Sequence, residues 1–344
     1  MKRKDFTILV KAGMLMTAAI LVAVLGWKLL FVFPRQTRLS DDLRYSRDLF
    51  RSQYRENGNT VLDAFNPASS DTAIVTSYTN DEIIQTRDFY DEVNFQNAFQ
   101  KKSTTKIKGF VIAGLVNHHA LAQTLIVEFF ASLKSINQKI DRVVIISPDH
   151  NKAGRGSITT HLRPYATPDG PVYVDTSFVE LLVERNLLVV DNGTMFEKEH
   201  GVGALVPFIH HEFPSALIVP FAVRGNAMKD ELLNFGRALS RLVDQNTIII
   251  ISSDMSHYLP TEQALKNDKV TLDWLKTLNF SELAKADDDY LDNGAAMAVL
   301  DGVFLEQKIK PTFLSIDHSI STKYGADPSN TTSYITGVWT RPAE

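Results

Sequence analysis

The sequence predicts an α/β protein of three layers, with helices on both faces of a largely parallel sheet, preceded by one transmembrane helix. Three observations support this expectation. After about residue 81, short apolar runs alternate with helix-length segments, which is typical of parallel strands joined by crossover helices. Two β-branched runs, at 143–146 and 248–251, lead directly into ionisable residues. The amino terminus carries one long apolar segment.

Strands are expected where β-branched and apolar residues run together, and helices where longer segments carry apolar residues at helical spacing. The predicted strands are 108–114, 142–147, 187–190, 216–223 and 247–252, followed by edge-like strands at 312–316 and 333–340. The predicted helices are 121–137, 176–185, about 202–211, 229–244, 261–278 and 294–307. Together these elements form one α/β domain over residues 81–344.

The amino-terminal segment has the features of a membrane anchor. A basic start at residues 2–4 precedes the apolar stretch 12–33, whose 22 residues would cross a ~30 Å hydrocarbon core as a helix. Lys28 can extend toward the interface beside Trp27. A cleaved signal peptide is disfavoured because no small-x-small pattern precedes Pro34. We expect a single-pass protein of a bacterial or archaeal cell membrane, with the lipid bilayer as a partner.

Charge and composition define the remaining organisation. Residues 1–34 are the cytoplasmic tip and anchor, 35–80 a polar juxtamembrane stalk, and the domain follows. Because basic residues at the amino terminus stay cytoplasmic, we expect the domain to be extracytoplasmic. A net charge of -4 argues against nucleic acid as a partner. The absence of cysteine excludes disulfides, thiolate nucleophiles and thiolate metal ligands.

Polar residues follow three of the predicted strands. His118, His150 and His257 come shortly after the strands at 108–114, 142–147 and 247–252. Ligands of parallel sheets sit beyond the carboxyl ends of the strands, so we expect these histidines to converge, with Asp254 and Asp292 as carboxylate partners. Each histidine alone could be an ordinary loop residue. Two imidazoles and one carboxylate suit non-haem Fe(II), and zinc would accept them too.

Other motifs are weaker. The segment EKEHGVGALVPFIHH contains His200, which could approach the site, and His210 and His211, which we expect to face solvent. It lacks the second histidine of the His-Glu-x-x-His zinc motif. The segment KAGRGS lacks the lysine of a phosphate loop. Ser252 and Ser253 have no nucleophile elbow around them.

Six segments carry a family resemblance. GFVIAGLVNHHA and IISPDHN resemble Pro-His-Ala-Gly and Gly-Pro-x-His blocks and place His118 and His150. TPDGPVYVD and EKEHGVGALVPFI resemble Thr-Pro-x-Gly and Glu-His-Ser-x-Glu blocks. IISSDMSHY resembles Ser-Ser-Asp-x-x-His-Tyr, and DNGAAMAVL falls at a Cys-Gly. Over about residues 86–338 the chain therefore resembles the Memo family (AmmeMemoRadiSam system protein B), a relative of the class III extradiol ring-cleaving dioxygenases.

The resemblance implies a site and an activity. Its metal ligands would be His118, His150 and Asp292, and its ion divalent, with Fe(II) favoured and Zn²⁺ or Mn²⁺ accepted. His257 would be the catalytic acid–base residue, oriented by Asp254, in a non-haem oxidoreductase of the extradiol dioxygenase type.

Departures from the family blocks leave alternatives open. Asn117 replaces a proline, Ala120 a glycine and Asp292 the cysteine, and a polar residue of the Glu-His-Ser block is now glycine. The domain could instead be a non-catalytic extracytoplasmic binding or scaffold module with a degenerate metal site. Asp292 could also be only the N-cap of the helix at 294–307.

Overall fold

The computed structural model describes residues 83–90, 92–100, 103–136 and 138–341. The predicted anchor at 12–33 and stalk at 35–80 lie outside these residues. Within them, no helix is both long enough and apolar enough to cross a membrane.

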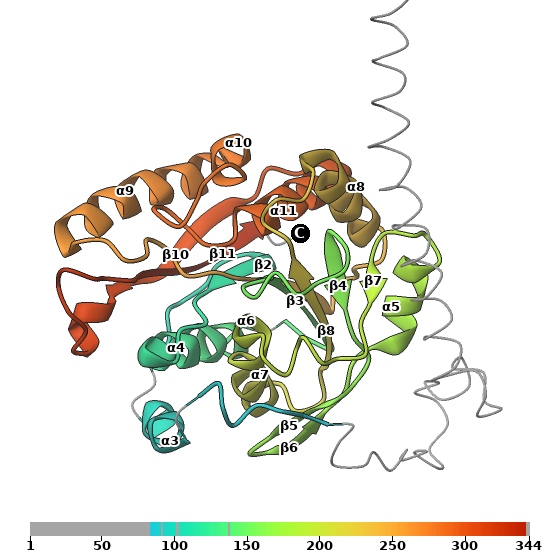
Figure 1. The fold of residues 1–344 in the computed structure, drawn as a ribbon, viewed down its shortest axis with the longest axis horizontal. Coiled ribbons are helices and arrows are strands. Elements are labelled where there is room, and N and C mark those ends of the chain that lie inside the picture. The colour runs from blue at the N-terminus through green and yellow to red at the C-terminus, as the bar shows by residue number, and fades with distance from the viewer. Residues whose placement is uncertain (1–82, 91, 101–102, 137, 342–344) are drawn as a thin grey trace, which may run out of the picture. The chain divides into compact units, whose positions relative to one another are not determined.

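A mixed eight-stranded sheet forms the centre of the domain (Figure 1). Its strand order is β10 (Thr312–Ile320), β11 (Ser333–Arg341), β2 (Phe110–Val116), β9 (Thr247–Ser252), β3 (Arg142–Pro148), β8 (Leu217–Val223), β4 (Ile158–Thr160) and β7 (Val189–Val190). The four central strands, β2, β9, β3 and β8, are parallel. The flanks add antiparallel pairs, β10 with β11, β11 with β2, and β4 with β8. The expected parallel pairing therefore holds for the four central strands and for β4 with β7 at one edge.

The last strand differs from its prediction. We expected an edge-like strand at 333–340, but β11 lies between β10 and β2 and is buried along all but its final residue. Because β11 pairs with β2, it covers the hydrogen-bonding edge of β2 and leaves β10 as the edge strand of the sheet. A second sheet of three short strands was not predicted: β1 (Ile84–Gln85), β5 (Tyr165–Thr167) and β6 (Gly170–Val172).

Helices lie on both sides of the main sheet. In Figure 1, α8 (Lys229–Ser240) and α11 (Gly294–Gln307) lie on one side, and α4 (Gln123–Lys134), α6 (His200–Gly203) and α7 (Val206–Glu212) on the other. The remaining helices are α3 (Glu92–Gln100), α5 (Thr176–Val183), α9 (Thr261–Thr277) and α10 (Phe280–Leu283), with short 3-10 helices η2 (Ala120–Ala122) and η3 (Ser321–Tyr324). The single helix expected at about 202–211 is two helices, α6 and α7, with a proline in the first turn of α7, where its missing N–H costs nothing.

One asparagine links the ends of two central strands to a helix. The pairing of β3 with β9 ends at Ile146 and Ile251. Just beyond, the buried amide of Asn293 donates to the carbonyl oxygens of Ile146 (3.1 Å) and Ser252 (2.9 Å). Its Oδ1 accepts from the backbone N–H of Ala296 at 3.2 Å, capping α11. Asn293 thus fixes the start of α11, and with it the neighbouring Asp292, against the carboxyl ends of β3 and β9.

Candidate metal centre

The predicted residues meet at the carboxyl edge of the sheet. Asp292 Oδ2 lies 3.2 Å from His118 Nε2, 3.6 Å from His150 Nε2 and 3.9 Å from His257 Nε2. Asp254 Oδ2 lies 3.9 Å from the Nε2 atoms of both His118 and His257. The three histidines follow β2, β3 and β9, and Asp292 precedes α11, so four elements that are distant in sequence bring these groups together.

Hydrogen bonds at the Nδ1 atoms fix the orientation of the three imidazole rings. His257 Nδ1 lies 2.7 Å from the Met255 carbonyl oxygen, which can only accept. His118 Nδ1 lies 2.9 Å from Ser252 Oγ, whose own proton goes to the carbonyl oxygen of Gly201 at 2.6 Å. Both Nδ1 atoms therefore donate, and each Nε2 of the neutral ring keeps a free lone pair.

His150 is held in the same way by a buried carboxylate. Its Nδ1 lies 2.5 Å from Glu199 Oε1, and its backbone N–H donates to Glu199 Oε2 at 3.0 Å. Glu199, the residue that precedes α6, is fully buried and also accepts from the backbone N–H of Gly201 at 2.9 Å. A carboxylate behind a histidine is the usual device that orients an imidazole toward a metal ion.

Asp292 is the carboxylate that faces the three Nε2 atoms. Its Oδ1 accepts from Ser253 Oγ at 2.8 Å, whereas its buried Oδ2 finds no hydrogen-bond donor among the residues that the structure describes. The alternative that Asp292 is only a helix cap is wrong, because Asn293 caps α11. A buried carboxylate oxygen that faces three imidazole nitrogens is unfavourable unless protons on the rings or a metal ion supply positive charge.

The spacing of these atoms fits a metal ion. Ligand nitrogen and oxygen atoms lie about 2.1 Å from a bound ion, which separates them by ~3.4 Å in a tetrahedral arrangement. The three distances to Asp292 Oδ2, 3.2 to 3.9 Å, lie around this value. Clusters of His118, His150 and His200, and of His118, Asp254 and Asp292, each have ligand atoms within 4.8 Å of one another. These residues could therefore hold a divalent ion.

The pKa shifts show which groups balance the negative charge of the buried carboxylates when no ion is present. Burial alone would lower the pKa of His150, but the nearby carboxylate of Asp292 and the hydrogen-bonded carboxylate of Glu199 outweigh it and raise that pKa to about 10. Burial of His118 is likewise outweighed by Asp254 and Asp292, which raise its pKa. The pKa of Asp292 is lowered, against the effect of its burial, by His118, His150 and His257. Protons on the imidazoles therefore occupy the place of a cation.

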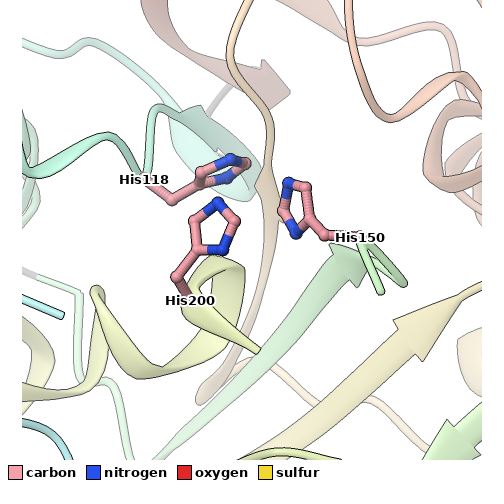
Figure 2. Close-up of side chains that lie close together, drawn as sticks. All are labelled: His118, His150 and His200. Atoms are coloured by element: carbon pink, nitrogen blue, oxygen red, sulfur yellow. The ribbon is translucent and has the colours of Figure 1, made fainter. Parts of the chain in front are cut away.

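His200 lies beside the centre without belonging to the predicted ligand set. Figure 2 shows its ring, at the start of α6, facing those of His118 and His150. It stacks on His150 with ring centroids 3.9 Å apart and meets His118 edge-on at 5.0 Å. Burial, together with the charges of the two neighbouring histidines, lowers the pKa of His200 to about 4, so this ring is neutral near pH 7.

Other sequence expectations have mixed outcomes. We expected Asp254 to orient the ring of His257, but the carbonyl oxygen of Met255 holds that ring. Instead, Asp254 Oδ1 accepts from the backbone N–H of His118 at 3.1 Å. His211 is exposed as expected, whereas His210 is partly buried, with its Nδ1 2.7 Å from Thr167 Oγ1.

Several supporting residues could not be assigned from the sequence. Glu199, Ser252, Ser253 and Asn293 orient the predicted ligands or their backbone, yet each reads as an ordinary polar residue. The sequence offers two signals: Glu199, Ser252 and Ser253 fall in segments that resemble family blocks, and the two serines stand at the end of an apolar run, directly before Asp254.

A close contact between the end of β3 and α6 lies behind His150. Ser147 Oγ is buried and lies 3.4 Å from Glu199 Oε1. Gly201 faces it so closely that an added Cβ would lie 2.2 Å from Ser147 Oγ and 3.2 Å from His150 Cε1. The absence of a side chain at Gly201 therefore makes room for the hydroxyl of Ser147.

The fold and the site together define a class of protein: an α/β domain with a candidate divalent-metal centre of histidines and one carboxylate at the carboxyl ends of its parallel strands. A family model described as Memo-like protein matches residues 91–338. This chain belongs to the Memo-like family, as its sequence motifs predicted.

Curated relatives agree with this assignment. A MEMO1 family protein of Caldivirga maquilingensis is 29% identical over 177 residues, covering 51% of this chain and 58% of the relative. One from Aquifex aeolicus is 30% identical over 148 residues, covering 42% and 54%. The chain thus spans less than two thirds of the length of these two relatives.

One solved structure is similar at a low level. It is described as an uncharacterized protein of Escherichia coli K12, with a TM-score of 0.42 and 12% identity, covering 66% of this chain and 99% of that chain.

Proposed function

We propose that this chain is a membrane-anchored Memo-like protein whose domain binds one divalent metal ion through His118 Nε2, His150 Nε2 and Asp292 Oδ2. The observation that carries the proposal is the buried Oδ2 of Asp292, which lacks a hydrogen-bond donor among the described residues and faces three imidazole lone pairs. Two imidazoles and one carboxylate suit Fe(II), which we favour, while Zn²⁺ and Mn²⁺ are accepted by the same donor atoms.

The reaction we propose is oxidation of an aromatic diol, of the extradiol dioxygenase type. A bound ion would supply a positive charge and open positions where diol oxygens and dioxygen can meet. His257 would move the diol proton. Because its Nδ1–H is held by the Met255 carbonyl at 2.7 Å, its Nε2 is the atom that accepts a proton. Asp254 Oδ2, 3.9 Å from that Nε2, would stabilise the resulting imidazolium.

The competing proposal is a metal-binding module without turnover, which would use the same ligands as a structural or ligand-binding site. Oxygen uptake by the Fe(II)-loaded protein in the presence of catechols separates the two. Uptake that depends on His257 supports the enzyme. Metal binding without uptake of oxygen supports the module.

Metal content tests the ligand assignment. We expect the full-length protein, purified in detergent, to retain a divalent ion. His150→Ala and Asp292→Asn should each lower bound metal at least about tenfold, since even indirect partners of ligands act on that scale. Asn keeps an oxygen for the hydroxyl of Ser253 but removes the charge, so the variant tests whether the ion needs an anionic ligand at this position. His210→Ala is the control. Equal metal content in all four proteins would refute the assignment.

The membrane anchor needs a separate test. The apolar stretch 12–33 and its basic flank support a single-pass protein whose domain is extracytoplasmic. Protease added to intact spheroplasts should digest the domain and spare an amino-terminal tag. Protection of the domain together with loss of the tag would reverse the orientation.

A further inference from the structure

Tyr258 occupies a backbone position that its side chain makes unfavourable. Its φ of 56° is in the left-handed region, which glycine and asparagine adopt readily and bulky residues rarely do. The side chain is nevertheless 74% exposed, so little burial of the ring offsets this cost. A large aromatic group that is strained and still faces solvent has no evident role in folding.

The neighbouring backbone imposes this conformation. On one side, the N–H of His257 donates to the carbonyl oxygen of Asp288 at 2.8 Å. On the other, Leu259 forms an antiparallel bridge with Thr331, whose N–H donates to the carbonyl oxygen of Leu259 at 2.8 Å. Strained residues persist where surrounding contacts fix them in this way, and they concentrate at sites that clamp ligands.

The ring stands at the candidate metal centre. Its centroid lies 5.6 Å from that of His257, whose Nε2 faces Asp292. Two other large apolar side chains are exposed in segments that follow the same parallel strands, Leu121 (41%) in η2 after β2 and Met228 (64%) after β8. The edge of the sheet that gathers the charged groups thus also presents exposed apolar side chains.

We propose that Tyr258 determines the specificity of the site by stacking on the face of a planar aromatic ring whose two adjacent oxygens reach the ion. This inference rests on the metal-binding function proposed above. Offset stacking of aromatic rings adds affinity of about three- to tenfold beyond the area that it buries. The backbone contacts on either side of Tyr258 fix the direction of its Cα–Cβ bond before the ligand arrives, which lowers the cost of ordering the side chain on binding.

The test measures the binding of two probes to the metal-loaded full-length protein without oxygen. 4-Nitrocatechol offers two oxygens on an aromatic ring, and oxalate offers two oxygens without a ring. We expect Tyr258→Asn to weaken nitrocatechol about three- to tenfold and Tyr258→Phe to leave it within about twofold. Binding of oxalate should be the same in all three proteins.

A matched control separates backbone strain from binding. Lys308 has nearly the same φ, 55°, at the carboxyl end of α11, the end of that helix away from Asp292. Tyr258→Asn and Lys308→Asn should both raise the melting temperature, but only the former should weaken nitrocatechol. Unchanged nitrocatechol binding by Tyr258→Asn would overturn the stacking proposal, and so would a parallel loss of oxalate. A wild type that binds no metal would overturn the proposed function as well, and the metal content of the same samples distinguishes these failures.

Discussion

Loading the metal-free protein with a divalent ion should release protons. In the metal-free state, the nearby carboxylate of Asp292 and the hydrogen-bonded carboxylate of Glu199 overcome the effect of burial and raise the pKa of His150 to about 10. An imidazole that binds an ion through Nε2 must be neutral. The proton on His150 therefore has to leave, and the raised pKa of His118 acts in the same direction.

The structure gives the size of this effect. Removing the proton of His150 at pH 7 costs about three pKa units, or ~4 kcal/mol. The apparent affinity for the ion should therefore rise about tenfold per pH unit between pH 7 and 10, and more steeply where His118 is also protonated. Stability of the metal-free protein should change in the opposite direction. The folded pKa of His150 is raised above its unfolded value near 6.5, so its contribution is complete below pH 6.5 and is lost as pH rises toward 10.

Calorimetric titration with Mn²⁺ in two buffers of different ionisation enthalpy, at the same pH, measures the number of protons. We expect between about one and two protons per ion at pH 7. Glu199→Gln removes one of the two carboxylates that raise the pKa of His150, so this control should release fewer. Heats that do not depend on the buffer, with an affinity that is constant from pH 6.5 to 9, would refute the reasoning.

Three further changes test the structure around the centre. His161 is buried, and its Nε2 lies 2.9 Å from the Tyr165 hydroxyl. Burial and the nearby charge of an arginine lower the pKa of this histidine to about 3. The free energy of unfolding should therefore fall by about 1.4 kcal/mol per pH unit as pH drops from 6.5 toward 3, and His161→Gln should flatten this dependence in urea titrations. Asn293→Ala leaves two buried carbonyl groups without a donor and uncaps α11, which should lower the unfolding free energy by about 2–4 kcal/mol in the same assay. Gly201→Ser should lower the free energy of unfolding by about 1–3 kcal/mol and weaken metal binding, because its Cβ would lie 2.2 Å from Ser147 Oγ. Adding Ser147→Gly to this variant should restore both stability and metal binding.

Each of these predictions has a result that contradicts it. His161 is not the acid-sensitive group if its glutamine variant keeps the full slope below pH 6.5. A loss under about 1 kcal/mol in Asn293→Ala would mean that water replaces the amide, since unsatisfied buried groups cost more than that. Failure of the double variant to recover would show that the contact between Ser147 of β3 and Gly201 of α6 is not what excludes a side chain at Gly201.

The convergence of the histidines could be predicted from the sequence for a simple physical reason. His118, His150 and His257 each follow a strand of the parallel centre, and parallel strands end at one edge of a sheet. Asp292 lies on a loop before a helix, so the sequence offered it only as one of two candidate carboxylates, and the family resemblance singled it out as the ligand. Its role as a cap looked equally reasonable, because neighbouring residues compete for that position and Asn293 occupies it.

Groups that depend on packing between distant elements could not be predicted. Glu199 reaches His150 because α6 packs across the end of β3, which no local pattern reveals. The interior position of β11 likewise depends on its antiparallel pairing with β2, whereas a short apolar segment at the end of a chain reads as an edge strand. Residue spacing predicts which side chains share an edge or a face, but not which backbone groups behind them complete the site.

The contact between Ser147 and Gly201 has a consequence for descent within the family. Where the family blocks read Gly-Pro-x-His and Glu-His-Ser, this chain has Ser147 in the first and Gly201 in the second. A side chain at Gly201 would lie too close to the hydroxyl of Ser147, so we expect serine at both positions to be disfavoured. A lineage that passed between the two arrangements would then pass through an ancestor with glycine at both positions. We expect relatives with glycine at both positions to be found more often than relatives with serine at both.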